Sequence, residues 1–292
     1  MAEPFLKWAG GKRWIAARLA ACFHAVGRKR YIEPFLGSGA VFFALESPDG
    51  LLSDVNHDLI GAFCAIRDNP DFVIRSLAQR TITQVSFTQM RDWKPLDPLH
   101  RAVRLIYLNK TAFNGIYRVN QNGDFNVPFG CKPGTRLCQP TVIRAASEAL
   151  QSTELRSADF RVTLKSARAT DAIYIDPPYT VKHDNNGFRR YNEKIFSWED
   201  QCDLARLLHA LASEGAAILI SNANHDAIRR LYRRDTFARL TLTRASLMSG
   251  SVGGRGTCTE LLLASRSAFG SETEFRRLIT ASATESPDGP IS

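Results

Sequence analysis

The first part of the chain alternates short apolar segments with helical ones, and this alternation limits the fold more than any other feature. Residues 31–36 indicate a strand that ends in the glycine turn 37–39. The pattern then predicts a helix over Ala40–Glu46, a strand over Leu51–Asp54 and a helix over Val55–Arg67. Strands that alternate with helices in this order are typical of an α/β protein with a parallel sheet.

The middle of the chain has a different character, which indicates an inserted subdomain over residues 71–141. The helical stretches Phe72–Gln79 and Leu99–Leu108 alternate there with loops rich in Asn, Gly and Pro. Asn122-Gly123 stands between two extended segments and predicts a β-hairpin, because both turn positions require a positive φ. We therefore expect a basic, mostly helical insert that carries a hairpin.

The α/β rhythm resumes at residue 142. Residues 1–70 and 142–267 are expected to form the main domain, and residues 268–292 a flexible tail with an amphipathic segment at Thr273–Ile279. The predicted helices are Val142–Gln151, Trp198–Ser213 after the capping residue Ser197, and His225–Tyr232. The predicted strands are Arg161–Leu164, Asp171–Ile175, Ala216–Ser221 and an antiparallel pair of Leu240–Ser246 with Thr259–Ser265.

The net charge indicates an anionic partner. The chain has 38 Lys and Arg against 29 Asp and Glu, a formal charge of +9, which suggests a polyanion such as nucleic acid. The excess is concentrated in the predicted insert and in the arginines at 229, 230, 233, 234, 239 and 244, for which a solvated helix face is the alternative.

The cysteines and the apolar segments indicate a compartment. The 6 cysteines form no CxxC pair, which favours free thiols in a reducing environment. No apolar run has the length of a membrane span, and residues 1–12 lack the apolar stretch of a signal peptide. We therefore expect a cytoplasmic protein without a membrane partner.

The glycine turn and Asp54 together predict a site for a nucleoside cofactor. Glycines after a first strand let a cofactor approach the backbone, and the next helix offers free N–H groups. Asp54 ends the second strand, where a carboxylate accepts hydrogen bonds from ribose hydroxyls. Phe42 stands where a dinucleotide fingerprint requires a small residue, and this disfavours NAD. A purely structural glycine turn is the alternative.

A second candidate is the N-terminal segment Lys7-Trp8-Ala9-Gly10-Gly11-Lys12. It is similar to a phosphate-binding P-loop, but Leu6 and Arg13 occupy positions that this motif gives to Gly and to Ser or Thr. An aromatic ring, two glycines and a lysine suit an anionic small molecule instead. The alternative is a structural turn that buries Trp8.

The most specific candidate is Asp176-Pro177-Pro178-Tyr179, directly after a predicted strand. Two prolines fix φ and remove two backbone donors at the end of the strand where α/β sites lie. The aspartate and a proline carbonyl are acceptors for an exocyclic amine, and the tyrosine ring suits a flat base. This combination predicts transfer of a group to the amine of a nucleobase.

Five segments in a fixed order carry a resemblance to a known family: Phe5–Lys12, Tyr31–Gly39, Leu52–Leu59, Leu108–Gly130 and Tyr174–Tyr179. From Phe5 to about Ser265 the sequence resembles the Dam-type DNA adenine-N6 methyltransferases. The resemblance implies a Rossmann-like methyltransferase fold with S-adenosylmethionine as donor and no metal. It also implies that residues 71–141 recognise double-stranded DNA and that the target adenine is flipped out of the helix.

The resemblance also implies roles for single residues. Catalysis falls to Asp176, Pro177, Pro178 and Tyr179. Donor binding falls to Trp8, Gly10, Gly11, Lys12, Glu33, Phe35, Gly37, Ser38, Gly39, Asp54, Asp159, Phe160 and Asp176. The DNA-binding candidates are Tyr117, Arg118, Asn120, Gln121, Asn122, Arg136, Arg189, Arg190 and Arg233. Tyr117 is equally well explained as a core aromatic.

Several alternatives stay open at this point. Gln121 and Asn122 differ from the residues of the enzymes that read GATC, so the resemblance does not imply that site. Cytosine-N4 methylation, RNA adenine methylation and a catalytically silent DNA-binding regulator are the other functions. The protein acts as a monomer or as a homodimer on DNA.

Overall fold

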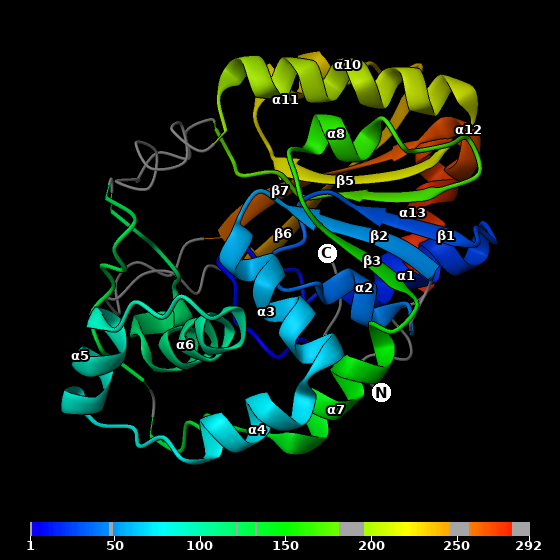
Figure 1. Ribbon diagram of the computed structural model, residues 1–292. Helices are drawn as coiled ribbons and strands as arrows, with labels where there is room; N and C mark the ends of the chain where they lie inside the picture. The colour runs from blue at the N-terminus through cyan, green and yellow to red at the C-terminus, as the bar shows by residue number, and fades with distance from the viewer. Residues whose placement is uncertain are drawn as a thin grey trace. The chain divides into compact units, whose positions relative to one another are not determined.

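The computed structural model describes residues 2–46, 49–120, 122–131, 133–180, 196–245 and 257–281 (Figure 1). The chain divides into two compact units. The first consists of Met1–Ala16 and Leu36–Asp159, and the second of Ala17–Phe35 and Phe160–Ser292. The predicted insert over residues 71–141 lies wholly within the first unit, so a separate recognition domain stays a prediction.

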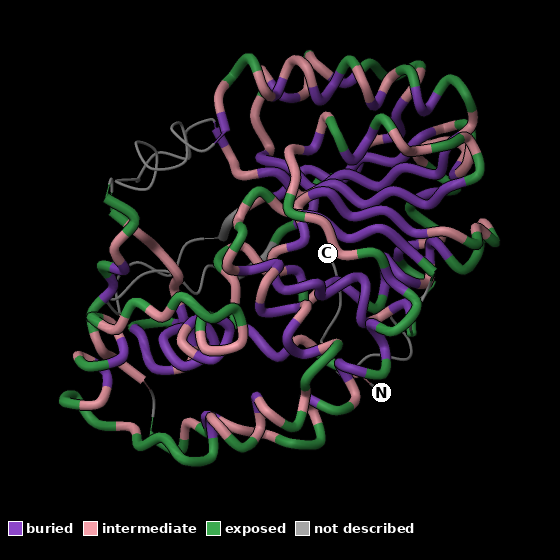
Figure 2. Tube along the Cα trace, in the orientation of Figure 1, coloured by how far each residue is buried: buried purple, intermediate pink, exposed green. Residues whose placement is uncertain are grey.

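The second unit is built on five strands. In spatial order they are β1 (Arg30–Glu33), β4 (Ala172–Ile175), β5 (Ala217–Ala223), β7 (Thr257–Ser265) and β6 (Phe237–Ala245). The first three run parallel, and β7 runs antiparallel to both β5 and β6. Every residue of β4 and β5 is buried, as Figure 2 shows, which explains their continuous apolar sequences. The predicted closing antiparallel pair is confirmed.

Both helices predicted in this unit before residue 268, Trp198–Ser213 and His225–Tyr232, are confirmed within one residue at each end. In α10 (Trp198–Glu214) the hydroxyl of Ser197 accepts from the backbone N–H of Asp200, whose carboxylate accepts from that of Ser197. This capping box fixes the start of the helix, and Gly215 with a φ of 107° ends it. The other helices are α1 (Ala16–Ala25), α8 (Phe160–Leu164), α11 (Asp226–Leu231), α12 (Arg266–Phe269) and α13 (Glu272–Ala281).

The strand predicted at Arg161–Leu164 is wrong, because this segment belongs to helix α8. Helical spacing buries Phe160 and Leu164, while Arg161 pairs with Asp200 and Asp203 of α10. A segment of four residues is too short to distinguish the two periodicities. The strand of this region lies earlier, as β3 (Thr153–Ser157), which the sequence did not indicate since it has a single large apolar residue.

Residues 272–281, which were predicted to belong to a flexible tail, form a helix. The predicted amphipathic segment is confirmed as part of α13, and its side chains Phe275 and Ile279 are buried. The Phe275 ring packs on Phe269 with centroids 6.0 Å apart. This packing means that a flexible tail does not start at residue 268, and residues 282–292 lie outside the described part.

The first unit pairs β2 (Asp49–Asp54) in parallel with β3, from Gly50 opposite Thr153 to Asp54 opposite Ser157. Side chains of α3 (His57–Asp68) and α6 (Pro98–Thr111) form much of its core. Its helices are α2 (Ala40–Ala44), α3 (His57–Asp68), α4 (Pro70–Ala78), α5 (Gln84–Asp92), α6 (Pro98–Thr111), the 3₁₀ turn η1 (Phe113–Gly115) and α7 (Pro140–Ala149). The helices predicted over 55–67, 72–79, 99–108 and 142–151 are thus confirmed within a few residues.

The predicted hairpin forms a turn, but little strand pairing extends from it. Val119 pairs with Phe125 in an isolated antiparallel bridge, and the backbone N–H of Asn120 donates to the carbonyl of Asp124 at 2.8 Å. Gly123 has a φ of 79°, as predicted for the second position of the Asn-Gly pair.

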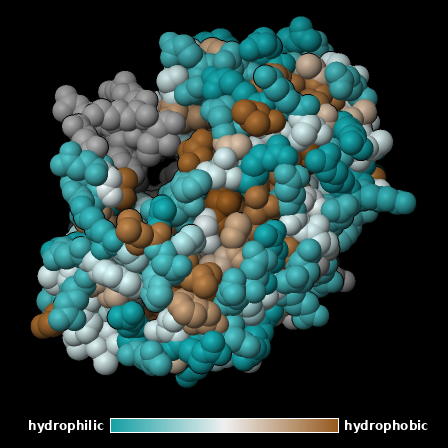
Figure 3. Space-filling view, in the orientation of Figure 1, coloured by the Kyte–Doolittle hydropathy of each residue, from teal (hydrophilic) through white to brown (hydrophobic). Residues whose placement is uncertain are grey.

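Seven strands, mostly parallel, thus give the chain a mixed α/β fold. Figure 3 shows mostly hydrophilic side chains on the face in view, with hydrophobic residues scattered among them. Within the described ranges, no helix combines the length and the apolar character that crossing a membrane requires.

Candidate active site

The N-terminal segment of the first unit lies against its glycine turn. Trp8 is so close to Gly37 that a Cβ added there would stand 2.9 Å from Cδ1 of the indole. Gly37 also has a φ of 50°, so both contact and conformation require glycine. Lys12 is 4% exposed, and its Nζ donates to the carbonyl of Gly10 at 2.9 Å. The structure therefore brings Trp8, Gly10, Lys12 and the turn together.

Asp54 ends β2 beside the same turn. Its carboxylate accepts hydrogen bonds from the backbone N–H groups of Gly37 at 3.2 Å and Asn56 at 2.9 Å. Burial raises the pKa of Asp54, and these two hydrogen bonds oppose the shift. The group is thus an oriented acceptor in a partly buried place, which suits the hydroxyl donors of a ribose.

The rest of the turn is packed tightly. Ser38 and Gly39 are buried, and the N–H of Gly39 donates to the carbonyl of Leu36 at 2.8 Å. A Cβ at Gly39 would meet Phe43 at 3.4 Å, and Gly39 has a φ of 65°. Gly11 closes the N-terminal turn, since its N–H donates to the carbonyl of Trp8 at 3.0 Å.

Asn109 is a residue of this region that the sequence analysis did not single out. Its Oδ1 accepts from the backbone N–H of Lys7 at 2.9 Å, and its Nδ2 donates to the carbonyls of Lys7 at 2.6 Å and Gly115 at 3.0 Å. The side chain is fully buried. Asn109 therefore ties the N-terminal segment to the end of α6. A polar residue in the buried run 105–109 was the available signal.

Tyr117 contacts the same segment. Its ring stacks on Trp8 and is tilted against Phe125, and its hydroxyl donates to Asp58 at 3.3 Å. A residue from the predicted DNA set thus lies against one from the predicted donor set, within the first unit.

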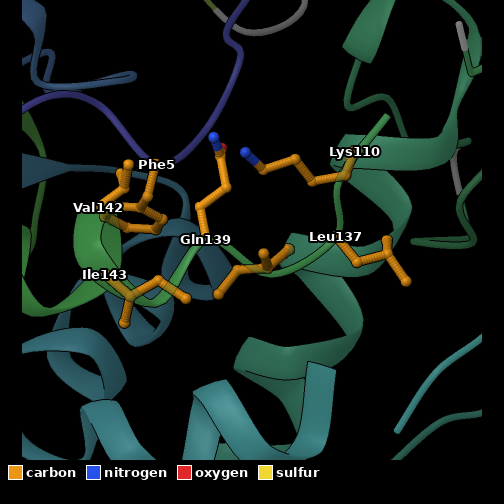
Figure 4. A pocket seen from close by; sticks show the side chains of 7 residues that line it. Phe5, Lys110, Leu137, Gln139, Val142 and Ile143 are labelled. Atoms are coloured by element: carbon orange, nitrogen blue, oxygen red, sulfur yellow. The ribbon is translucent and has the colours of Figure 1, made fainter. Parts of the chain in front are cut away.

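A small pocket also lies in the first unit. Its cavity volume is about 10 Å³, which holds no more than about one water molecule and no nucleoside. Figure 4 shows the polar ends of Lys110 and Gln139 close together in it. Burial and the nearby Arg13 and Lys7 lower the pKa of Lys110. The other lining residues are Phe5, Ile106, Leu137, Val142 and Ile143.

The second unit holds Asp176–Tyr179, directly after β4. Pro177 is buried, while Asp176, Pro178 and Tyr179 are half-buried. The hydroxyl of Tyr179 donates to the carboxylate of Glu260 on β7. Burial, then the charges of Asp176 and Glu260, raise the pKa of Tyr179 well above its usual value, so the phenol stays protonated.

Glu33 ends β1 in the same unit. It is buried and accepts a hydrogen bond from the hydroxyl of Tyr31 at 2.9 Å. The rings of Phe35 and Phe160 stack with centroids 5.6 Å apart, and Phe196 packs on both. Asp159 is the last residue of the first unit and is half-buried.

Some of the residues predicted to read bases are engaged in hydrogen bonds within the protein, and others are exposed. Oδ1 of Asn120 accepts from the backbone N–H groups of Asn122 and Asp124, both at 2.9 Å, so its carbonyl builds the turn. Arg118 donates to Asn126 at 2.8 Å. Asn122 and Arg136 are exposed. Gln121, Arg189 and Arg190 lie outside the described residues.

The arginines at 228–244 do not form a single helix face. Only Arg229 and Arg230 belong to α11, and Arg229 donates to Asn224 at 2.6 Å. Arg239 lies in β6 and donates to the carbonyls of Arg229 and Tyr232. Arg233, by contrast, has a side chain that is 68% exposed. The side chain of Arg244 lies outside the described part.

A family comparison now decides the identity of this fold. The sequence profile of the D12 class N6 adenine-specific DNA methyltransferases matches residues 8–246. The chain belongs to this class. The methyltransferase therefore transfers the methyl group of S-adenosylmethionine to the N6 amine of adenine in DNA.

Individual proteins similar to this chain are also methyltransferases. A Type II methyltransferase of Lactococcus lactis subsp. cremoris is 30% identical over 273 residues, which cover 89% of this chain and 94% of the relative. The DNA adenine methylase of Vibrio cholerae is 31% identical over 268 residues, which cover 89% of this chain and 95% of the relative. A DNA N-6-adenine-methyltransferase of Escherichia phage P1 is 34% identical over 89% of this chain and 35% of its own length.

Proposed function

We propose that this methyltransferase acts on duplex DNA, in the cytoplasm of a bacterial cell, and modifies an adenine that has left the base stack. The half-buried position of Asp176 beside the buried Pro177 supports this proposal. A base inside the helix does not reach such a site, so it has to be flipped out at a cost of a few kcal/mol.

Asp176 and Pro177 would orient the target amine. The carboxylate of Asp176 accepts one N–H and the carbonyl of Pro177 the other, which turns the nitrogen lone pair toward the methyl group. As the nitrogen becomes cationic, both hydrogen bonds strengthen, so they favour the transition state over the ground state. Tyr179 stacks on the adenine ring and holds it in this orientation.

Each unit contains residues that are candidates for binding the donor. When bound, S-adenosylmethionine supplies an electrophilic sulfonium methyl group. Asp54 accepts hydrogen bonds from the ribose hydroxyls. The backbone N–H groups of Gly37 and Asn56, which hold its carboxylate in place, support this role. The other residues proposed for the donor are Trp8, Gly10, Gly11, Lys12, Gly37, Ser38 and Gly39, with Glu33, Phe35, Asp159, Phe160 and Asp176.

DNA recognition would fall to residues 71–141. Asn122 is the better candidate for reading a base edge, because it is exposed while Asn120 uses its carbonyl in the turn. Tyr117, Arg118, Gln121 and Arg136 would contribute from the same segment. Arg189, Arg190 and Arg233 would contact phosphates.

The test uses purified protein, radiolabelled donor and unmethylated duplex DNA that is digested to nucleosides afterwards. We expect label in N6-methyl-2′-deoxyadenosine and its loss in D176A, while D176A still binds DNA. D203N is the matched control, since Asp203 is a carboxylate of α10 that pairs with Arg161 of α8 and Arg206 of α10. Label on RNA alone, or normal turnover by D176A, would contradict the proposal.

A further inference from the structure

The hydrogen bond from Tyr179 to Glu260 joins the loop after β4 to strand β7 within the second unit. Glu260 is 4% exposed, and the residues that follow it, Leu261–Leu263, are equally buried. A carboxylate in such a strand is costly unless it is hydrogen-bonded. Its presence therefore indicates that the hydrogen bond with Tyr179, which an apolar side chain would not form, has a function.

Glu260 stands on a rigid part of the sheet. Its strand pairs on both sides, so that Glu260 lies opposite Ala223 of β5 and Leu242 of β6. Tyr179, in contrast, lies in a segment without regular secondary structure. The hydrogen-bond acceptor is thus held by its backbone more firmly than the donor is.

The contact restricts the tyrosine ring. Fixing the hydroxyl as well as the Cα fixes the direction of the ring axis. Because a phenolic O–H prefers to lie in the plane of its ring, the direction of the carboxylate also restricts rotation of the ring about that axis. Because the raised pKa keeps the phenol protonated, Tyr179 remains a donor to the carboxylate over the neutral pH range. A charged acceptor also makes this hydrogen bond stronger than one between neutral groups.

We propose that Glu260 is a positioning residue for methyl transfer, which holds the Tyr179 ring in the plane that stacks on the target adenine. The proposal rests on the proposed function, in which Tyr179 is the stacking residue. Glu260 acts through Tyr179 and contacts neither the base nor the donor in this role. A misplaced ring would leave the amine out of line with the methyl group.

The experiment is a double-mutant cycle of E260A, Y179F and the double variant, measured by single-turnover methylation of unmethylated duplex DNA. We expect each single variant to slow transfer about tenfold, since each removes the same charge-assisted hydrogen bond. The double variant should be no slower than the slower single one. The donor dissociation constant should change less than about twofold, and E260Q, which keeps an acceptor, should restore most of the rate.

Ser265→Ala is the matched control. Ser265 is also buried on β7, and its hydroxyl bonds to the carbonyl of Ala216 at 2.8 Å and the N–H of Ile218 at 3.0 Å. We expect S265A to lower Tm but to transfer methyl groups at the normal rate where it is folded. If E260A slows transfer equally in the wild-type and Y179F backgrounds, or if E260Q is as slow as E260A, Glu260 has only a structural role.

Y179A separates the two proposals. A normal rate in Y179A overturns the stacking role of Tyr179, and with it this part of the proposed function. A slow Y179A with independent effects of E260A and Y179F overturns only the positioning role of Glu260.

Discussion

The indole of Trp8 stacks on the phenol ring of Tyr117, with ring centroids 5.8 Å apart and an angle of 17° between the planes. Trp8 belongs to the segment proposed for the donor. Tyr117 begins the segment that leads into the Asn-Gly turn and is proposed for DNA. Residues with two different proposed roles therefore share an aromatic contact in the first unit, so a change in one ring should alter the support of the other.

The first prediction concerns this stack. Tyr117→Ala removes a stacked pair worth about 0.5–1.5 kcal/mol, so the dissociation constant of S-adenosylmethionine should rise about two- to tenfold. Tyr117→Phe is the control, because it keeps the ring and loses the 3.3 Å hydrogen bond to Asp58, which Arg101 also contacts. Calorimetric titration without DNA measures both, and equal effects of the two variants would contradict the role of the ring.

Local patterns were enough to predict much of the fold. The segments β4 and β5 are buried on both faces, so their sequences are continuous apolar runs, and the ends of α10 are marked by Ser197 and Gly215. Where the local signal was weak, as in β3 and α8, prediction failed because edge strands and single helical turns leave almost no periodicity.

The candidate site was predictable to a similar extent. Asp54 and Gly37 meet because a strand end and the turn of its neighbour recur at a known spacing in α/β folds. Asn109 and Glu260 were not predictable, since their partners are 102 and 81 residues away in the sequence. No local sequence pattern predicts a contact between residues so far apart in the chain.

The second prediction concerns Asn109. Asn109→Ala removes three hydrogen bonds and leaves partly buried backbone groups of Lys7 and the buried carbonyl of Gly115 unpaired, so the free energy of unfolding should fall by about 2–4 kcal/mol. The N-terminal segment should also become more susceptible to proteases. Denaturant unfolding and limited proteolysis measure these effects, with the exposed Asn122→Ala as control. A variant as stable as Asn122→Ala would show that the clamp is dispensable.

The third prediction is a pH dependence of donor binding. The ionised carboxylate of Asp54 is the form proposed to accept hydrogen bonds from the ribose hydroxyls, and protonation would turn one of its two acceptor oxygens into a donor. Burial raises the pKa of Asp54 in the folded protein. Protonation therefore occurs at a higher pH than for an ordinary aspartate, and affinity for S-adenosylmethionine should fall as the pH is lowered through this raised value. Titrations across mildly acidic pH test this, with circular dichroism to verify the fold.

Asp54→Asn serves as the control for that titration. It should bind the donor weakly at every pH, because an amide is neutral throughout and offers a single acceptor oxygen. If the pH profile of this variant matches that of the unchanged protein, another group controls donor binding.

The fourth prediction separates two arginines of the basic region. Arg239 donates to the carbonyls of Arg229 and Tyr232, so Arg239→Ala should reduce the free energy of unfolding by about 1.5–3 kcal/mol. Arg233 is exposed and forms a surface ion pair with Asp235, so Arg233→Ala should leave stability within about 0.5 kcal/mol. Instead, it should weaken binding to all DNA sequences and reduce the salt dependence of binding by about one counterion. Binding isotherms at several salt concentrations measure this slope, and an unchanged slope would remove Arg233 from the phosphate contacts.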